Sequence, residues 1–105
     1  MTDHNALWIT EAETVELISL RDAIPALERG LSQEYAGKAN NMGKTHASWN
    51  EARGTLHAIG AVMEGNGVVG TKTWAHTPGG ASPLLILFSA ETGALLAVIE
   101  AFALG

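Results

Sequence analysis

Cysteine is absent from this 105-residue chain and charge is scarce, since only 16% of its residues are Asp, Glu, Lys or Arg. Without cysteine the chain can form neither a disulfide nor a thiolate metal site, which fits a reducing, cytoplasmic compartment. Its six Lys and Arg residues are outnumbered by eleven Asp and Glu residues and form no basic run. The electrostatic footprint of a nucleic-acid binder is therefore missing, and we expect no such partner.

Long hydrophobic runs are also lacking. The longest, Pro83 to Phe88, is far shorter than the roughly 20 residues that cross a bilayer, and the acidic start has no signal-peptide core. We therefore expect a cytoplasmic protein without a membrane partner. Hydrophobic residues nevertheless make up 47% of the chain, which excludes a disordered polymer and predicts a single domain over residues 1–105. Low charge also predicts apolar surface that another subunit or domain covers.

Two helices are predicted in the first third of the chain. Thr10 with Glu13, and Ser19 with Asp22, have the spacing of a capping box, in which each side chain satisfies the other residue's backbone amide. Pro25 is expected in the first turn of the second helix, where a missing N–H costs little. That helix carries an apolar stripe that is expected to face a core, formed by Ile24, Leu27, Leu31 and Tyr35.

Short β segments separated by Gly and Pro dominate the rest of the chain. Strands are predicted over residues 7–9, 45–49, 55–63, 68–75, 84–89 and 95–100. Consecutive apolar residues over 84–88 predict a strand that is covered on both faces. The expected class is α+β, with two N-terminal helices packed on one face of a mostly antiparallel sheet and no Rossmann domain.

Residues 65–70 match the dinucleotide motif G-x-G-x-x-G, and Glu91 lies about twenty residues beyond it, where a ribose-binding acid is expected. A dinucleotide site needs that motif to open a helix, because the pyrophosphate binds at the helix N-terminus. The residues that follow, 71–78, are β-branched, aromatic and end in proline. The sequence therefore predicts a hairpin turn here and no cofactor-binding residue.

Three basic residues are candidates for ligand binding. Lys72 is the only charged residue between Glu64 and Glu91, within a predicted strand of apolar and Thr residues. It either extends its ammonium to water or holds an anion. Lys44 lies between the helical part and the predicted sheet, and Arg53 lies at a predicted turn. Each of these side chains likewise either extends to water or holds an anion.

The four histidines, His4, His46, His57 and His76, show neither H-x-H nor H-E-x-x-H spacing. His46 and His57 can meet across neighbouring strands, but two imidazoles without a nearby carboxylate make a poor metal site. No metal site is predicted.

Three segments, residues 54–61, 67–72 and 82–100, together resemble the ornithine cyclodeaminase/mu-crystallin family. The family has a Gly-led strand, a strand ending in a functional lysine, and a hairpin like the Phe-Ser-Ala-Glu-Thr-Gly of residues 88–93. The opening Trp8-Ile9-Thr10 and the helix beginning near Asp22 are similar to the family's first elements. The resemblance covers nearly the whole chain.

The resemblance implies a domain that binds substrate and mediates dimerisation, followed in full-length relatives by a Rossmann domain that binds NAD(P). Members include ornithine cyclodeaminases, alanine and other amino- or imino-acid dehydrogenases, and ketimine-reducing mu-crystallins. It implies that Lys72 contacts the substrate carboxylate and assists proton transfer as a catalytic residue. Lys44 stands where the family places a carboxylate-binding arginine or lysine, and Arg53 joins these two lysines as a substrate-binding candidate.

Two departures from the family limit this expectation. Residues 59–61 are Ile-Gly-Ala where members have a Met-Pro-Ala-like stretch, and residue 105 stops short of the family's Arg-Thr pair. We expect a truncated or stand-alone member that forms a homodimer or higher oligomer, binds a small amino or imino acid and has no self-sufficient catalysis. The alternatives are the substrate-side half of an NAD-dependent deaminase or dehydrogenase, and an unrelated small α+β domain. Whether the chain is an enzyme stays open.

Overall fold

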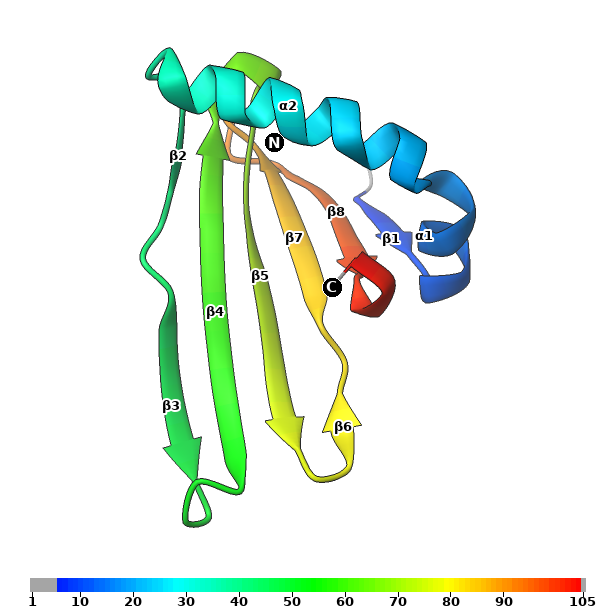
Figure 1. Ribbon diagram of the computed structural model, residues 1–105, viewed down its shortest axis with the longest axis vertical. Helices are drawn as coiled ribbons and strands as arrows, with labels where there is room; N and C mark the ends of the chain where they lie inside the picture. The colour runs from blue at the N-terminus through cyan, green and yellow to red at the C-terminus, as the bar shows by residue number, and fades with distance from the viewer. Residues whose placement is uncertain (1–5, 105) are drawn as a thin grey trace.

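The computed structural model describes residues 6–104 as one eight-stranded sheet with two α-helices on one side (Figure 1). The strand order is β1-β8-β7-β5-β4-β2, with β3 also paired to β4 and β6 also paired to β5. The strands are β1 (Leu7–Ile9), β2 (Ala39–Asn41), β3 (Thr45–Trp49), β4 (Gly54–Met63), β5 (Val68–Thr77), β6 (Gly80–Ala81), β7 (Leu84–Ser89) and β8 (Leu95–Glu100). The predicted α+β class is confirmed.

The sheet is antiparallel except where β1 runs parallel to β8. Its longest pairing joins β4 to β5, from Thr55 opposite His76 to Met63 opposite Val68. The two strands are connected by the short 3-10 helix η1 (Glu64–Asn66) and by Gly67, which adopts a left-handed φ of 72°. The glycine motif therefore lies in a hairpin, as predicted, and leads into strand β5 rather than into a helix.

Two short strands, β2 and β6, were not predicted. Their sequences, Ala-Asn-Asn and Gly-Ala, contain none of the β-branched or aromatic residues that mark a strand. Both owe their extended shape to a long neighbour, since β2 pairs with the end of β4 and β6 pairs with the end of β5.

The helices α1 (Glu11–Leu17) and α2 (Leu20–Tyr35) begin where their capping boxes predict, after Thr10 and Ser19. Pro25 lies in the second turn of α2, so its expected place in the first turn is wrong. The Ser19 cap starts the helix at Leu20, ahead of the proline. At that depth the proline ring removes an intrahelical hydrogen bond.

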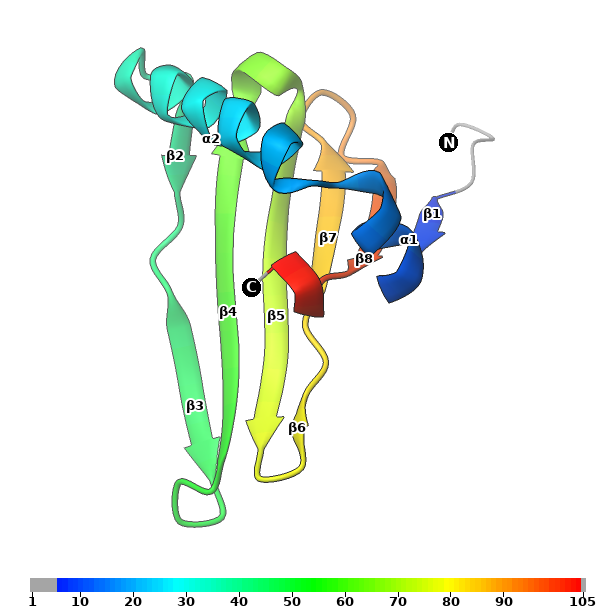
Figure 2. The same cartoon turned by 45° about the vertical axis from the view of Figure 1, so that its right-hand side comes forward.

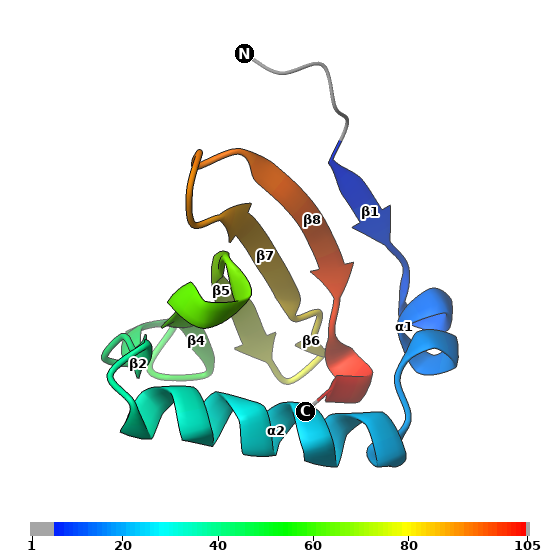
Figure 3. The same cartoon turned by 90° about the horizontal axis from the view of Figure 1, so that it is seen from above.

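Both helices lie on the same side of the sheet, which curves around them (Figures 2 and 3). The C-terminal half of α2 contacts the sheet, because Gln33 donates a hydrogen bond to Asn66 and Asn41 donates one to Glu34 at 3.3 Å. A Cβ on Gly30 of α2 would meet Met63 of β4 at 3.5 Å. We call the side of the sheet that carries Met63 the helix face and the opposite side the bare face.

The buried core of the described residues is very small. Its buried apolar residues are Ala39, Ala97 and Ala101, and Thr14 is also buried, with its hydroxyl donating to the Glu100 carbonyl at 2.8 Å. Two expectations are therefore wrong. The α2 stripe does not form a core, since its side chains are 50–97% exposed. Strand β7 is half-buried rather than covered on both faces, because both described helices lie on the same side.

The exposed surface is too large for a self-contained domain of this size. The chain exposes 7563 Å², whereas a folded monomer of 11.0 kDa exposes about 5,600 Å². Its radius of gyration, 15.1 Å, also exceeds the value of about 13 Å that is usual for this length. The fold thus presents apolar surface of the kind that another layer covers.

Candidate functional site

The two lysines singled out from the sequence meet at one tryptophan. The Lys44 and Lys72 ammonium nitrogens lie 5.5 Å and 5.4 Å from the centroid of the Trp74 ring, within the range of a cation–π contact. Lys72 lies opposite Ile59 in the β4–β5 pairing. Lys44 directly precedes β3, whose first residue lies opposite Ala58, so Ile59 stands between the two lysines.

Three aromatic rings stand side by side next to the lysines on the helix face. His46, His57 and Trp74 lie opposite one another on β3, β4 and β5. The two histidine rings are 5.8 Å apart, and the His57 and Trp74 rings are 4.8 Å apart and 10° from parallel. The predicted meeting of His46 with His57 is confirmed.

Trp74 is a functional candidate that the sequence reasoning missed. A tryptophan in an apolar strand more often belongs to a core, and no motif singled it out. The available signal was its spacing from Lys72, because residues two apart on a strand point to the same face.

Arg53 does not lie near the two lysines and Trp74. It lies in the turn between β3 and β4, where its backbone N–H donates to the Asn50 carbonyl at 3.0 Å. That turn runs through three consecutive residues of positive φ, numbers 50–52. Ile59 lies further along β4, roughly 20 Å away on an extended strand. The substrate-binding role of Arg53 stays a prediction that this geometry does not favour.

His57 lies in the middle of the ring stack, in surroundings that disfavour its protonated form. Its Nε2 lies 2.9 Å from the Thr55 hydroxyl, whereas its buried Nδ1 has no hydrogen-bond partner. Burial, followed by the charges of Lys44, His46 and His76, holds the pKa of His57 below its ordinary value of 6.5. A proton on His57 is disfavoured because it would be poorly solvated and would join other basic groups.

The depressed pKa of His57 predicts a loss of stability in acid. The unfolded chain takes up this proton at its ordinary pKa while the folded chain resists it. This contribution to stability is therefore complete above pH 6.5 and is lost as the pH falls toward the lower folded-state value. Urea unfolding at several pH values should show that His57→Asn flattens the fall below pH 6.5. An unchanged slope in the variant would contradict this assignment.

An apolar cavity of about 320 Å³ lies beside Lys72 on the helix face. Its apolar lining includes Ile59, Ala61, Met63, Leu85 and Leu87. Lys72 is the charged residue of that lining. An ammonium lining an apolar cavity suits a small molecule that carries a carboxylate next to an apolar part.

Among residues 6–104, no group of three or more His, Cys, Asp or Glu side chains could hold a metal ion. His4 lies outside the described residues. None of the helices within that range is long and apolar enough to cross a membrane.

Solved structures of amino-acid enzymes are similar to this chain over nearly its whole length. A probable ornithine cyclodeaminase from Bordetella pertussis Tohama I is 26% identical with a TM-score of 0.87, and the match covers 95% of this chain and 32% of that one. An archaeal alanine dehydrogenase, a dimer with bound NAD, is 31% identical with a TM-score of 0.83, covering 94% of this chain and 32% of that one. The predicted resemblance to the ornithine cyclodeaminase family is confirmed.

A third structure, the iminosuccinate reductase of Paracoccus denitrificans in complex with NAD+, has a TM-score of 0.88 over 96% of this chain and 34% of that one. At 19% identity it supports the ornithine cyclodeaminase-like fold alone. This chain spans about a third of the length of each of these structures. No family model and no curated protein matches it.

NAD is bound in two of these similar structures, but the glycine segment of this chain lacks the context of a dinucleotide site. Its G-x-G-x-x-G segment closes a hairpin and enters β5, so no helix N-terminus is presented to a pyrophosphate. The side chains that do converge on the helix face are Lys44, Lys72 and the three rings of the stack.

Proposed function

We propose that this chain supplies the substrate side of an amino- or imino-acid deaminase or dehydrogenase of the ornithine cyclodeaminase type. A substrate carboxylate binds between the ammonium groups of Lys44 and Lys72. The convergence of both lysines on Trp74 carries the proposal. Two like charges held near one ring repel each other, and an anion between them turns that repulsion into two charge-assisted contacts.

The two lysines have different roles in this proposal. Lys44, at the entry to β3, anchors the carboxylate. Lys72 lines the apolar cavity as well as facing Trp74, so its ammonium can also exchange a proton at the nitrogen of a substrate bound there. Hydride transfer needs a nicotinamide held against the substrate carbon, and the described residues do not fit one. We therefore propose that the chain binds substrate without catalysing by itself, and that a dinucleotide-binding domain completes the enzyme.

Association with a second copy of the chain is the other part of the proposal. The bare face is mostly apolar over its central strands, where Val62, Val69, Ile86 and Val98 lie on the side opposite the lysines. Its acidic residue, Glu100, is held at the sheet edge by the Trp8 indole N–H at 2.8 Å. The large exposed area supports a symmetric dimer or higher oligomer that buries this face.

A pure interaction module is the competing function, favoured by the small core and the large exposed surface. Titration of the chain with L-alanine, L-proline and NADH, followed by Trp fluorescence, separates the two. The proposed function predicts saturable amino-acid binding that shifts the Trp74 signal in a Trp8→Phe/Trp49→Phe background, and no response to NADH. An oligomer that binds neither amino acid would be an interaction module. NADH binding would overturn the assignment of the glycine segment.

A further inference from the structure

Acidic residues are missing from most strands of the sheet. Strands β2, β3, β4, β5, β6 and β7 contain no Asp or Glu, although the chain as a whole has a net charge of −5. The acids of this region, Glu51, Glu64 and Glu91, lie in the connections between strands. The ionisable residues within these six strands are all basic, namely His46, His57, Lys72 and His76, and Lys44 directly precedes β3.

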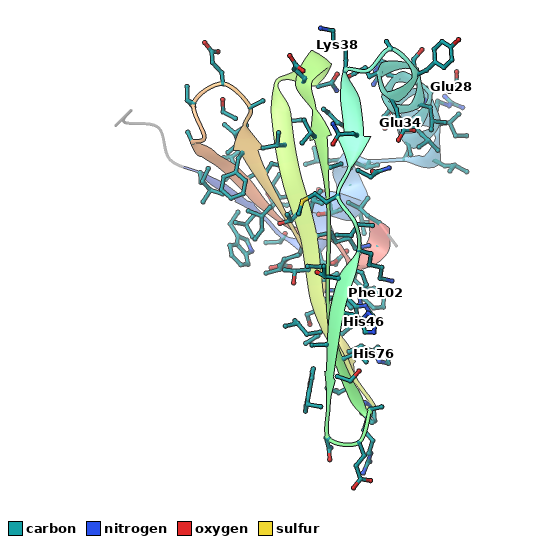
Figure 4. All side chains as sticks on the ribbon, turned by 90° about the vertical axis from the view of Figure 1, so that its left-hand side faces the viewer. Glu28, Glu34, Lys38, His46, His76 and Phe102 are labelled. Atoms are coloured by element: carbon teal, nitrogen blue, oxygen red, sulfur yellow. The ribbon has the colours of Figure 1, made fainter. Side chains whose placement is uncertain are left out.

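These five basic residues share the helix face. His46, His57 and Trp74 are register partners, Lys72 precedes Trp74 by two residues and His76 follows it by two. Figure 4 shows His46 and His76 on the same side of the sheet as α2. The charges of Lys44, His46 and His76 all act on His57. One half of the helix face is thus a basic, aromatic surface within an acidic chain.

A single carboxylate does not neutralise the positive charge of this surface. The two ammonium groups near Trp74 carry two positive charges, and a monocarboxylate supplies one negative charge. The remaining positive charge has no acidic residue within the strand body to compensate it. A ligand with a second anionic group is therefore the better electrostatic complement.

A second anionic group has a place to bind beside the first. His46 lies two residues beyond Lys44 on β3, about 6.6 Å along the strand, and its side chain is exposed. Allowing for the hydrogen bonds at each end, the two carboxylates of a four- or five-carbon dicarboxylic acid span that separation. An imidazole N–H at His46 can donate to the second carboxylate.

We propose that the site takes a short dicarboxylic amino or imino acid, with one carboxylate between Lys44 and Lys72 and the other at His46. This inference rests on the proposed function and adds the substrate class. His46 is its specificity-determining residue. A substrate with a second ammonium group would face only basic side chains on this surface and is disfavoured by this part of the site.

Succinate and butyrate test this inference, because both have four carbons and differ in the second carboxylate. Calorimetric titration of the full chain at low ionic strength should give a dissociation constant for succinate about tenfold or more below that for butyrate, the gain expected from one charge-assisted hydrogen bond. The preference should shrink as salt is added, since both partners are charged.

Variants separate the inference from the proposed function. His46→Ala should remove the preference for succinate over butyrate, whereas Lys38→Gln, at the far end of the sheet (Figure 4), should keep it. Equal binding of the two acids by the wild-type chain would overturn the dicarboxylate inference and leave the carboxylate site intact. Binding of neither acid would overturn the site itself. A succinate preference that survives His46→Ala would also refute the placement of the second carboxylate.

Discussion

Replacing Lys72 with glutamine is expected to weaken binding of L-alanine and of simple carboxylates at least about tenfold. The substitution keeps a polar side chain, one atom shorter, and removes the ammonium, so the carboxylate loses a charge-assisted contact of roughly 2 kcal/mol. Lys72 is half-buried and borders an apolar cavity, where water screens the lost charge less than it would on an open surface. The measurement is calorimetric or fluorescence titration of wild type and variant.

Two further variants make this result specific to the site. Lys72→Arg keeps the positive charge and should recover part of the binding, although the guanidinium is bulkier at the cavity edge. Lys38→Gln removes the same charge at the other end of the sheet and should bind as wild type does. If Lys72→Gln binds L-alanine as tightly as the wild type, Lys72 is a lysine that extends to solvent, and the proposed function loses its central residue.

Local signals in the sequence were enough to predict most of the secondary structure. Each capping box sets a helix start through contacts within four residues, which is why Thr10 and Ser19 were placed correctly. The glycine segment was interpreted correctly because a strand of β-branched residues follows it. Pro25 was misplaced because proline's preference for the first turn was followed, although the Ser19 cap starts the helix at Leu20.

The convergence of Lys44 and Lys72 could not be derived from spacing alone. It depends on the register of three strands, and a slip of one residue would turn a side chain to the opposite face. The register changes between β2 and β3, since Asn41 lies opposite Ala61 while Thr45 lies opposite Ala58. This irregularity sets Lys44 beside Ile59, and hence near Lys72. The resemblance to known enzymes identified both lysines before their geometry was known, but did not identify Trp74.

The exposure of apolar residues was the least predictable property. A helical stripe such as Leu27 and Leu31 shows that one side of a helix avoids water, but it does not say what covers that side. Here the described chain covers it poorly, and both side chains are more than half exposed. The low charge fraction was the available signal, because it predicted apolar surface on the chain. That a partner covers this surface stays a prediction.

A charged substitution at the centre of the bare face tests that partner surface. Ile86 lies between Thr71 and Val98 in the sheet register and points away from the helices. In a symmetric dimer that buries this face, Ile86→Asp would place an unpaired carboxylate in each half of an apolar interface. Each uncompensated buried charge costs about 3–5 kcal/mol, so the dimer dissociation constant should rise by a factor of at least about a thousand.

Sedimentation or light scattering across a concentration series measures this change, with Ile86→Val as the matched control that keeps the apolar surface. Wild type and Ile86→Val should associate at micromolar concentration, while Ile86→Asp should be a monomer there. Circular dichroism separates a folded monomer from an unfolded chain. Because Lys44 and Lys72 lie on the opposite face, a folded Ile86→Asp monomer should still bind L-alanine. A wild-type chain that is itself a stable monomer would show that the bare face is covered by something other than a second copy.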